Sequence, residues 1–111
     1  MSISMIGIDH SKASVDIRAK FSFTKKRAIE AMKKLKEEHG ILGCIILSTC
    51  NRMEVWVSTQ DDEEISLYDF LCKEKEVEKD EYQDYFMKRE NEEAVRHLFY
   101  LTSGLKSQNS C

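Results

Sequence analysis

The sequence predicts an α+β fold: a ferredoxin-like sandwich with the order β-α-β-β-α-β-α, a mostly antiparallel sheet and helices on one face. Three observations lead to this prediction. Short segments rich in β-branched residues are typical of strands. Segments with helical spacing lie between them, and one has clear start and stop signals. The chain of 111 residues, 41% hydrophobic and 33% charged, has the size and composition of one globular domain.

The first 40 residues contain a predicted strand followed by helices. Residues 2–9, SISMIGID, alternate loosely and predict a strand. Residues 11–23 have near-helical spacing, typical of a turn and a short helix. Thr24 is a good N-cap for a helix over 25–39, and Gly40 supplies a stop signal. The apolar stripe predicted for this helix consists of Ala28, Met32 and Leu35.

Two predicted strands follow in close succession. Residues 41–49 have the β-branched enrichment of a buried strand. Residues 52–59 alternate, with Met53, Val55 and Val57 on one side and Glu54 and Trp56 on the other. A tight connection or a sharp bend must therefore lie around residues 50 and 51.

The last third of the chain returns to helical spacing. Residues 64–75 predict a helix, and residues 82–89 a short strand. Asn91 is predicted to cap a final helix over 92–105. The apolar face predicted for that helix consists of Val95, Leu98, Phe99, Thr102 and Leu105.

The charge distribution is uneven although the net charge is only -3. Residues 1–40 carry nine Lys or Arg against five acids, whereas residues 61–93 carry five against fourteen. The basic cluster is typical either of a phosphate-binding surface or of a solvated helix face. No apolar run approaches the roughly 20 residues of a membrane-spanning helix, and the N-terminus lacks the pattern of a signal peptide. A cytoplasmic location without membrane attachment is the default expectation.

The four cysteines show none of the short paired spacings of a zinc or redox site, so free thiols are expected in a reducing cytosol. Only Cys50 stands among polar residues. A thiol becomes a good nucleophile as thiolate, and nearby cations and hydrogen-bond donors favour that form. The alternative for Cys50 is a small buried hydrophobe. Its polar neighbours are Ser48, Thr49, Asn51 and Arg52.

His97 is a second candidate for chemistry, since it is the only histidine in the interior of a predicted helix. Imidazole titrates near neutrality and is a natural acid or base partner for a cysteine. The alternative is a surface histidine on an amphipathic helix. The four glycines are scattered and form no phosphate-binding loop, which argues against a dinucleotide-binding unit.

Three blocks together resemble the N-terminal catalytic domain of glutamyl-tRNA reductase, the first committed enzyme of tetrapyrrole synthesis from glutamate. They are GIDHSKASVDIRAKFSF at 7–23, LSTCNRMEVW at 47–56 and AVRHLFYLTSGLKS at 94–107. They occur in the family's order, and the S-T-C-N-R block is highly specific. The resemblance identifies residues 1–107 as this domain.

The resemblance implies a mechanism for an oxidoreductase of porphyrin and heme biosynthesis. Cys50 matches the nucleophile that attacks the ester of glutamyl-tRNA, giving a thioester that NADPH reduces to glutamate-1-semialdehyde. His97 matches a histidine important for this activity. Arg52 matches the arginine that holds the substrate's carboxylate, a task suited to a planar bidentate donor. The other residues matching substrate contacts are Thr49, Asn51 and Ser107, and no metal is implied.

The resemblance implies that residues 108–111 are a divergent or truncated tail, at the point where the family continues into an NADPH-binding domain and a dimerisation domain. The full-length family is a homodimer through that last domain. We therefore expect this chain to contact the aminoacyl end of glutamyl-tRNA but to lack NADPH-dependent reduction on its own. The alternative, from a different class, is a non-catalytic α+β interaction module that keeps the fold.

Overall fold

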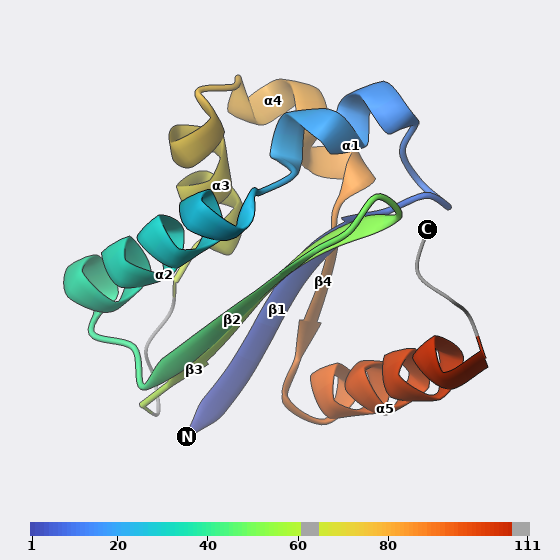
Figure 1. Ribbon diagram of the computed structural model, residues 1–111. Helices are drawn as coiled ribbons and strands as arrows, with labels where there is room; N and C mark the ends of the chain where they lie inside the picture. Colours follow the sequence, from blue (N-terminus) through green and yellow to red (C-terminus); the bar gives the residue numbers. More distant parts are fainter. Residues whose placement is uncertain (61–64, 108–111) are drawn as a thin grey trace.

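The structure, a computed structural model, describes residues 1–60 and 65–107, without the side chains of 101–107 (Figure 1). Within these residues, a four-stranded sheet is combined with five α-helices and one short 3₁₀ helix, η1. The elements are β1 Ser2–Asp9, α1 Val15–Phe21, α2 Lys25–His39, β2 Gly43–Ser48, β3 Arg52–Thr59, α3 Leu67–Lys75, α4 Lys79–Tyr82, η1 Gln83–Tyr85, β4 Met87–Glu90 and α5 Asn91–Ser107.

The strands lie in the order β2-β3-β1-β4, and all three pairings are antiparallel. β3 thus lies between β1 and β2, as in a ferredoxin-like sandwich, and the predicted fold class is confirmed. The register places Gly7 of β1 opposite Glu54 of β3, and Ile45 of β2 opposite Trp56.

Helices cover both faces of the sheet. α1 to α4 lie on one face, whereas α5 packs against β1 and β4 on the opposite face, so the prediction of helices on one face was wrong for α5 (Figure 1). The central strands permit this because both of their faces carry buried apolar side chains. Ile6 and Ile8 enter the main core, whereas Met5 joins a smaller cluster with Trp56 and Ala94.

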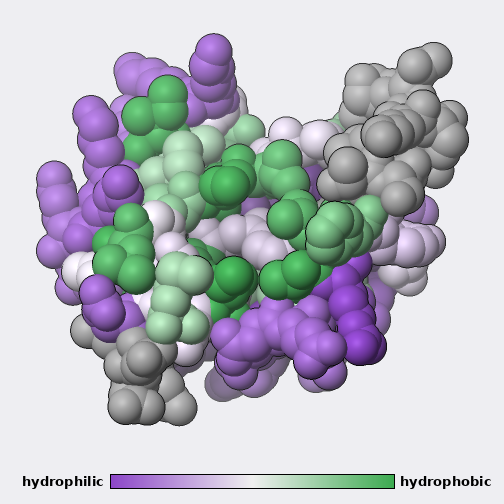
Figure 2. Space-filling model, turned by 90° about the horizontal axis from the view of Figure 1, so that it is seen from below, coloured by the Kyte–Doolittle hydropathy of each residue, from purple (hydrophilic) through white to green (hydrophobic). Residues whose placement is uncertain are grey.

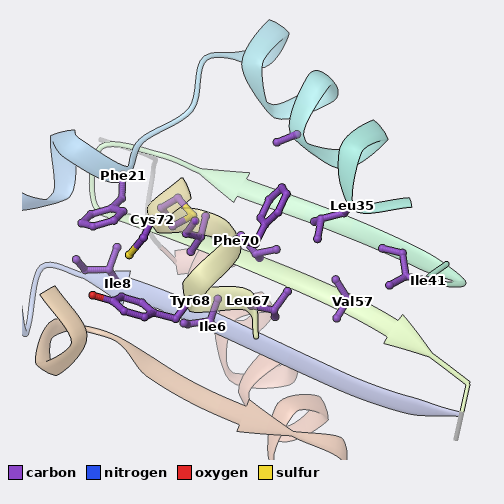
Figure 3. Packing of buried hydrophobic residues seen from close by; sticks show 14 of the residues in the cluster. Ile6, Ile8, Phe21, Leu35, Ile41, Val57, Leu67, Tyr68, Phe70 and Cys72 are labelled. Atoms are coloured by element: carbon purple, nitrogen blue, oxygen red, sulfur yellow. The ribbon is translucent and has the colours of Figure 1, made fainter. Parts of the chain in front are cut away.

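The main core fills the space between the sheet and α1, α2 and α3 (Figure 3). Phe21, at the end of α1, is fully buried there. Its ring makes edge-to-face contacts with Tyr82 and Phe86, at centroid distances of 5.4 and 4.9 Å. These contacts fasten α1, and with it the segment that leads to α2.

The boundaries predicted for α2 are confirmed. Thr24 Oγ1 accepts a hydrogen bond from the Arg27 backbone N–H at 3.2 Å, and Gly40 ends the helix at φ 60°, a left-handed conformation that suits glycine. The buried stripe differs by part of a turn from the predicted one. Ala31 and Leu35 are the buried residues of the helix.

Two other predictions were wrong in detail. The strand predicted over 82–89 begins only at Met87, because the preceding aromatic residues form α4 and η1 and pack against the core. Asn91 lies at φ 49°, and its Oδ1 accepts a hydrogen bond from the Ile3 backbone N–H at 3.0 Å. The predicted cap thus ties the start of α5 to β1.

None of the helices in the described ranges is long and apolar enough to cross a bilayer.

Candidate functional site

Cys50 lies in the tight turn between β2 and β3. Thr49 holds this turn from within: its N–H donates to the Arg52 carbonyl at 2.8 Å. Its Oγ1 accepts from the backbone N–H groups of Asn51 and Arg52 at 3.2 and 3.3 Å. The threonine hydroxyl therefore sets the shape of the loop that presents Cys50.

The segment from β1 to α1 braces the same turn from outside. The His10 backbone N–H donates to the Asn51 carbonyl at 3.0 Å. Arg18 of α1 donates from one guanidinium nitrogen to the Ala13 carbonyl at 2.7 Å and from another to the Cys50 carbonyl at 3.3 Å. Figure 1 shows α1 beside the tip of the β2–β3 hairpin. A permanent cation thus lies next to the backbone of Cys50.

Replacing Thr49 tests its role in the turn. We expect Thr49→Val to lower the free energy of unfolding by about 0.5–1.5 kcal/mol, because two backbone N–H groups lose their acceptor. Thr49→Ser keeps the hydroxyl and is expected to stay within about 0.5 kcal/mol of the parent chain. Urea unfolding followed by circular dichroism measures both. Equal stability of the valine and serine variants would contradict the assignment.

A buried polar cluster lies on the α5 face of the sheet, a few residues beyond the turn. His97 Nε2 is 2.7 Å from Glu54 Oε2, and the two side chains are only 8% and 2% exposed. Trp56 Nε1 donates to Glu54 Oε1 at 3.0 Å. Arg52 places a guanidinium nitrogen 3.7 Å from Glu54 Oε2. Three donors thus converge on one buried carboxylate.

The indole N–H and the guanidinium can only donate, so Glu54 is the acceptor of this cluster. The hydrogen of the short contact therefore belongs to His97 Nε2, and Nδ1 is the other polar ring atom of His97. The imidazole also stacks on the Trp56 indole, with centroids 6.1 Å apart and an interplanar angle of 15°. Hydrogen bonding and stacking together fix the orientation of the ring.

Two small residues make room for the cluster. Gly7 lies opposite Glu54, and a Cβ there would be 2.9 Å from Glu54 Cγ. Ala94 is fully buried one helical turn before His97, so α5 approaches the sheet closely. Among the described side chains of α5, the predicted apolar face was wrong: Val95, Leu98 and Phe99 are exposed, whereas Ala94 and His97 turn inward. Thr102 and Leu105 of that predicted face lie outside the described side chains.

The structure brings several of the predicted site residues together. Thr49, Asn51 and Arg52 share the turn with Cys50, and Arg52 reaches His97 through Glu54. Glu54 follows Cys50 by four residues, which spans at most roughly 13 Å of extended chain. Ser107 is the last residue of α5, and its side chain lies outside the described residues.

Sequence reasoning missed Glu54 and Arg18. Glu54 stood on the polar side of an alternating strand and was assigned no role. The available signal was Trp56, two residues after Glu54 and on the same side of the strand. A strand face that carries a large indole is seldom exposed to solvent, so Glu54 was to be expected in a buried site. Arg18 had no signal in the sequence, since its contact with Cys50 joins residues 32 positions apart.

The expectation of free thiols is confirmed for Cys44 and Cys72. Burial raises the pKa of the Cys44 thiol, which also donates to the Met32 carbonyl at 3.7 Å. Cys44 is thus an unreactive internal reference for experiments on Cys50.

An ordered carboxylate lies close to the turn. Burial raises the pKa of Asp9, but two hydrogen bonds from Ser11 and the positive charges of Arg52 and His10 outweigh it and hold that pKa below its usual value. Asp9 remains charged at neutral pH. Within residues 1–60 and 65–107, no three His, Cys, Asp or Glu side chains are grouped as metal ligands.

Comparison with known proteins gives the same family over nearly the whole chain. The family model of the glutamyl-tRNA(Glu) reductase N-terminal domain matches residues 6–109. A glutamyl-tRNA reductase of Acetivibrio thermocellus is 37% identical over 108 residues, which cover 97% of this chain and 33% of that protein. One of an Exiguobacterium species is 41% identical over 109 residues, covering 96% and 24%.

A solved structure agrees with this. The glutamyl-tRNA reductase from Methanopyrus kandleri superposes with a TM-score of 0.69 at 32% identity, over 94% of this chain and 23% of that chain. The chain spans a quarter to a third of the length of these relatives. It belongs to the glutamyl-tRNA reductase family, in the region of that family's N-terminal domain.

Proposed function

We propose that this chain carries the acyl-transfer half of a glutamyl-tRNA reductase reaction in tetrapyrrole biosynthesis, with Cys50 as nucleophile. The observation that supports this most directly is the braced turn. Thr49 inside the turn and Arg18 of α1 hold Cys50 at the tip of a hairpin, and the strand that leaves this turn carries Arg52 and Glu54 of the cluster with His97. A mere scaffold has no physical need for this arrangement.

The proposed step is a thiol-for-ester exchange without redox change. The Cys50 thiolate attacks the carbonyl carbon of the glutamyl ester, and a carbon–sulfur bond forms. The tetrahedral intermediate then collapses, and the bond to the ribose oxygen of the tRNA breaks. That oxygen takes up a proton, so the products are a glutamyl thioester on Cys50 and uncharged tRNA.

The neighbouring groups have distinct proposed roles. Arg52 directs one nitrogen toward Glu54, which leaves guanidinium donors for the carboxylate of the glutamyl group. Asn51 and Thr49 shape the same pocket. His97, held by Glu54, is the proposed proton carrier through Nδ1. Glu54 is a positioning residue, since it acts through His97 and Arg52.

The later reduction needs NADPH, and the described residues do not fit this cofactor. A dinucleotide site requires a glycine-rich turn between a parallel strand and a helix. The sheet described here is antiparallel throughout, and Gly7, Gly40 and Gly43 lie in a strand, a helix cap and a second strand. We therefore assign hydride transfer to parts found in the longer relatives and no step of it to these residues.

Mass spectrometry of the chain after incubation with glutamyl-tRNA tests the acyl transfer. Under a reducing agent we expect the intact protein to gain the mass of one glutamyl group, located on the peptide that contains Cys50. Cys50→Ser is expected to lower the labelling at least 100-fold, because a serine hydroxyl is far less nucleophilic than a thiolate at neutral pH.

Cys44→Ser is the matched control, since Cys44 is the partly buried thiol of the same hairpin. It is expected to be labelled like the parent chain. Equal labelling of the parent chain and Cys50→Ser would exclude Cys50 as the nucleophile. Absence of labelling in a folded, reduced parent chain would reject acyl transfer by this chain.

A second candidate function, a non-catalytic interaction module, is favoured by exposed apolar residues on the α5 face. Figure 2 shows hydrophobic residues gathered on this side of the molecule. Ile45 of edge strand β2 is 59% exposed, and Phe99 and Tyr100 of α5 are 69% and 76% exposed. This function requires neither Cys50 nor Arg52, so binding that survives their replacement distinguishes it from catalysis.

A further inference from the structure

We propose that the cations at the junction of α1 and α2 bind the phosphates of the tRNA acceptor end and thereby bring the ester to Cys50. This inference rests on the proposed function and names the surface that receives the polyanion. Residues 17–29, IRAKFSFTKKRAI, contain five cations and no carboxylate, in a chain whose net charge is -3. The surface, called here the junction surface, consists of Lys20, Lys25, Lys26 and Arg27.

The junction surface lies beside the Cys50 turn. The Phe23 backbone N–H donates to Ser48 Oγ at 2.9 Å, and Ser48 precedes Cys50 by two residues. Arg18, one turn before the end of α1, contacts the Cys50 carbonyl itself. Lys25 follows Phe23 by two residues and therefore lies within roughly 20 Å of Cys50. A few nucleotides of an acceptor strand span this distance.

The charges of this surface are available to a ligand. Lys20, Lys25 and Lys26 are exposed, and within the described part of the chain none of them forms an ion pair. Arg27 forms an ion pair with Glu30 at 3.5 Å, and both side chains of that pair are open to water. By contrast, Lys34 farther along α2 is paired with Glu74 at 3.0 Å.

A further cation stands against the same junction. Lys75 of α3 places Nζ 3.8 Å from the centre of the Phe23 ring and donates to the Ser22 carbonyl. Burial lowers the pKa of Lys75, and the positive charge of Arg27 lowers it further. Like charges crowded in this way attract a polyanion, because each phosphate relieves their mutual repulsion.

Tight binding of phosphates has a defined salt signature. Each lysine–phosphate contact releases counterions and adds about 0.7–0.9 to the slope of log affinity against log salt. We therefore compare the parent chain with Lys25→Gln/Lys26→Gln by titrating fluorescently labelled, uncharged glutamate tRNA at several salt concentrations. The double variant is expected to bind about tenfold more weakly at 0.1 M salt, with a slope smaller by about 1.4–1.8.

Lys33→Gln/Lys36→Gln is the matched control. It removes the same charge from exposed positions of the same helix, roughly 12–16 Å farther along its axis. We expect its affinity to stay within about twofold of the parent chain. An equal loss in both double variants, or no loss in the first, would overturn the proposal, as would failure of the parent chain to bind tRNA.

A tRNA-free substrate separates this inference from the proposed function. A small thioester of glutamate is expected to acylate the parent chain and Lys25→Gln/Lys26→Gln at equal rates, because it carries no phosphates. If the small substrate acylates neither protein while tRNA binding still depends on the junction surface, the proposed acyl transfer is rejected and the proposed tRNA-binding surface is retained. A slower reaction of the double variant with the small substrate would instead place these lysines in the chemical step.

Discussion

Glu54→Ala is expected to lower the free energy of unfolding by about 3–5 kcal/mol, because two buried donors lose their common acceptor at a cost of about 1–3 kcal/mol each. The alanine leaves His97 and the Trp56 indole N–H without an acceptor in a site where their side chains are almost fully buried. It also leaves Arg52 without its nearest carboxylate. Glutamyl transfer to Cys50 is expected to fall as well, because His97 loses the group that orients it.

Urea unfolding, followed by circular dichroism and by the fluorescence of the single tryptophan, measures this loss. Glu92→Ala is the matched control: Glu92 pairs with Arg96 at 3.1 Å, but both side chains are more than three-quarters exposed. Its effect is expected to stay below about 0.5 kcal/mol. A loss of similar size in Glu54→Ala would contradict the buried cluster.

A double-mutant cycle separates the pair from its surroundings. If Glu54 and His97 stabilise each other, the double variant Glu54→Ala/His97→Ala loses less stability than the two single variants added together. We expect a difference of about 1–3 kcal/mol, the range found for residues in direct contact. Additive losses would mean that each side chain is held by other neighbours.

The sequence predicted the strand and helix pattern well where local chemistry decides it. The cap at Thr24 and the left-handed glycine at 40 act within a few residues of their own helix, so they can be read from the chain. Prediction failed where distant residues decide. Tyr82 and Tyr85 have the composition of a strand, but packing against the core draws them into helical turns.

The candidate site likewise contains residues that local sequence predicts and residues that only the fold brings together. Cys50, Asn51 and Arg52 are adjacent in the chain, so their shared turn is visible as a polar interruption between two strands. The second half of the site needs the sheet register and the face on which α5 packs, and neither is encoded locally. Glu54 meets His97 across 43 positions of sequence, and only the fold brings this pair together.

Gly7→Ala is expected to disturb the site from the opposite strand and to lower the free energy of unfolding by about 1–3 kcal/mol. The new Cβ would lie 2.9 Å from Glu54 Cγ and 3.2 Å from the Met53 carbonyl oxygen. The backbone oxygen belongs to the β1–β3 ladder, and the glutamate is held by His97 and Trp56, so neither can move cheaply. Changed Trp56 fluorescence and slower Cys50 acylation are expected together with the loss of stability.

Gly43→Ala distinguishes this clash from the general effect of a methyl group in a strand. Gly43 begins the edge strand β2, and its Cβ would meet only Ser58 Oγ at 3.4 Å, an ordinary contact. Alanine also restricts the unfolded chain more than glycine, so stability is expected to stay equal or to rise by up to about 1 kcal/mol. If both alanine variants lose stability equally, Gly7 is required by its strand and not by Glu54. If only Gly7→Ala loses both stability and acylation, the missing side chain at Gly7 is what gives Glu54 room in the site.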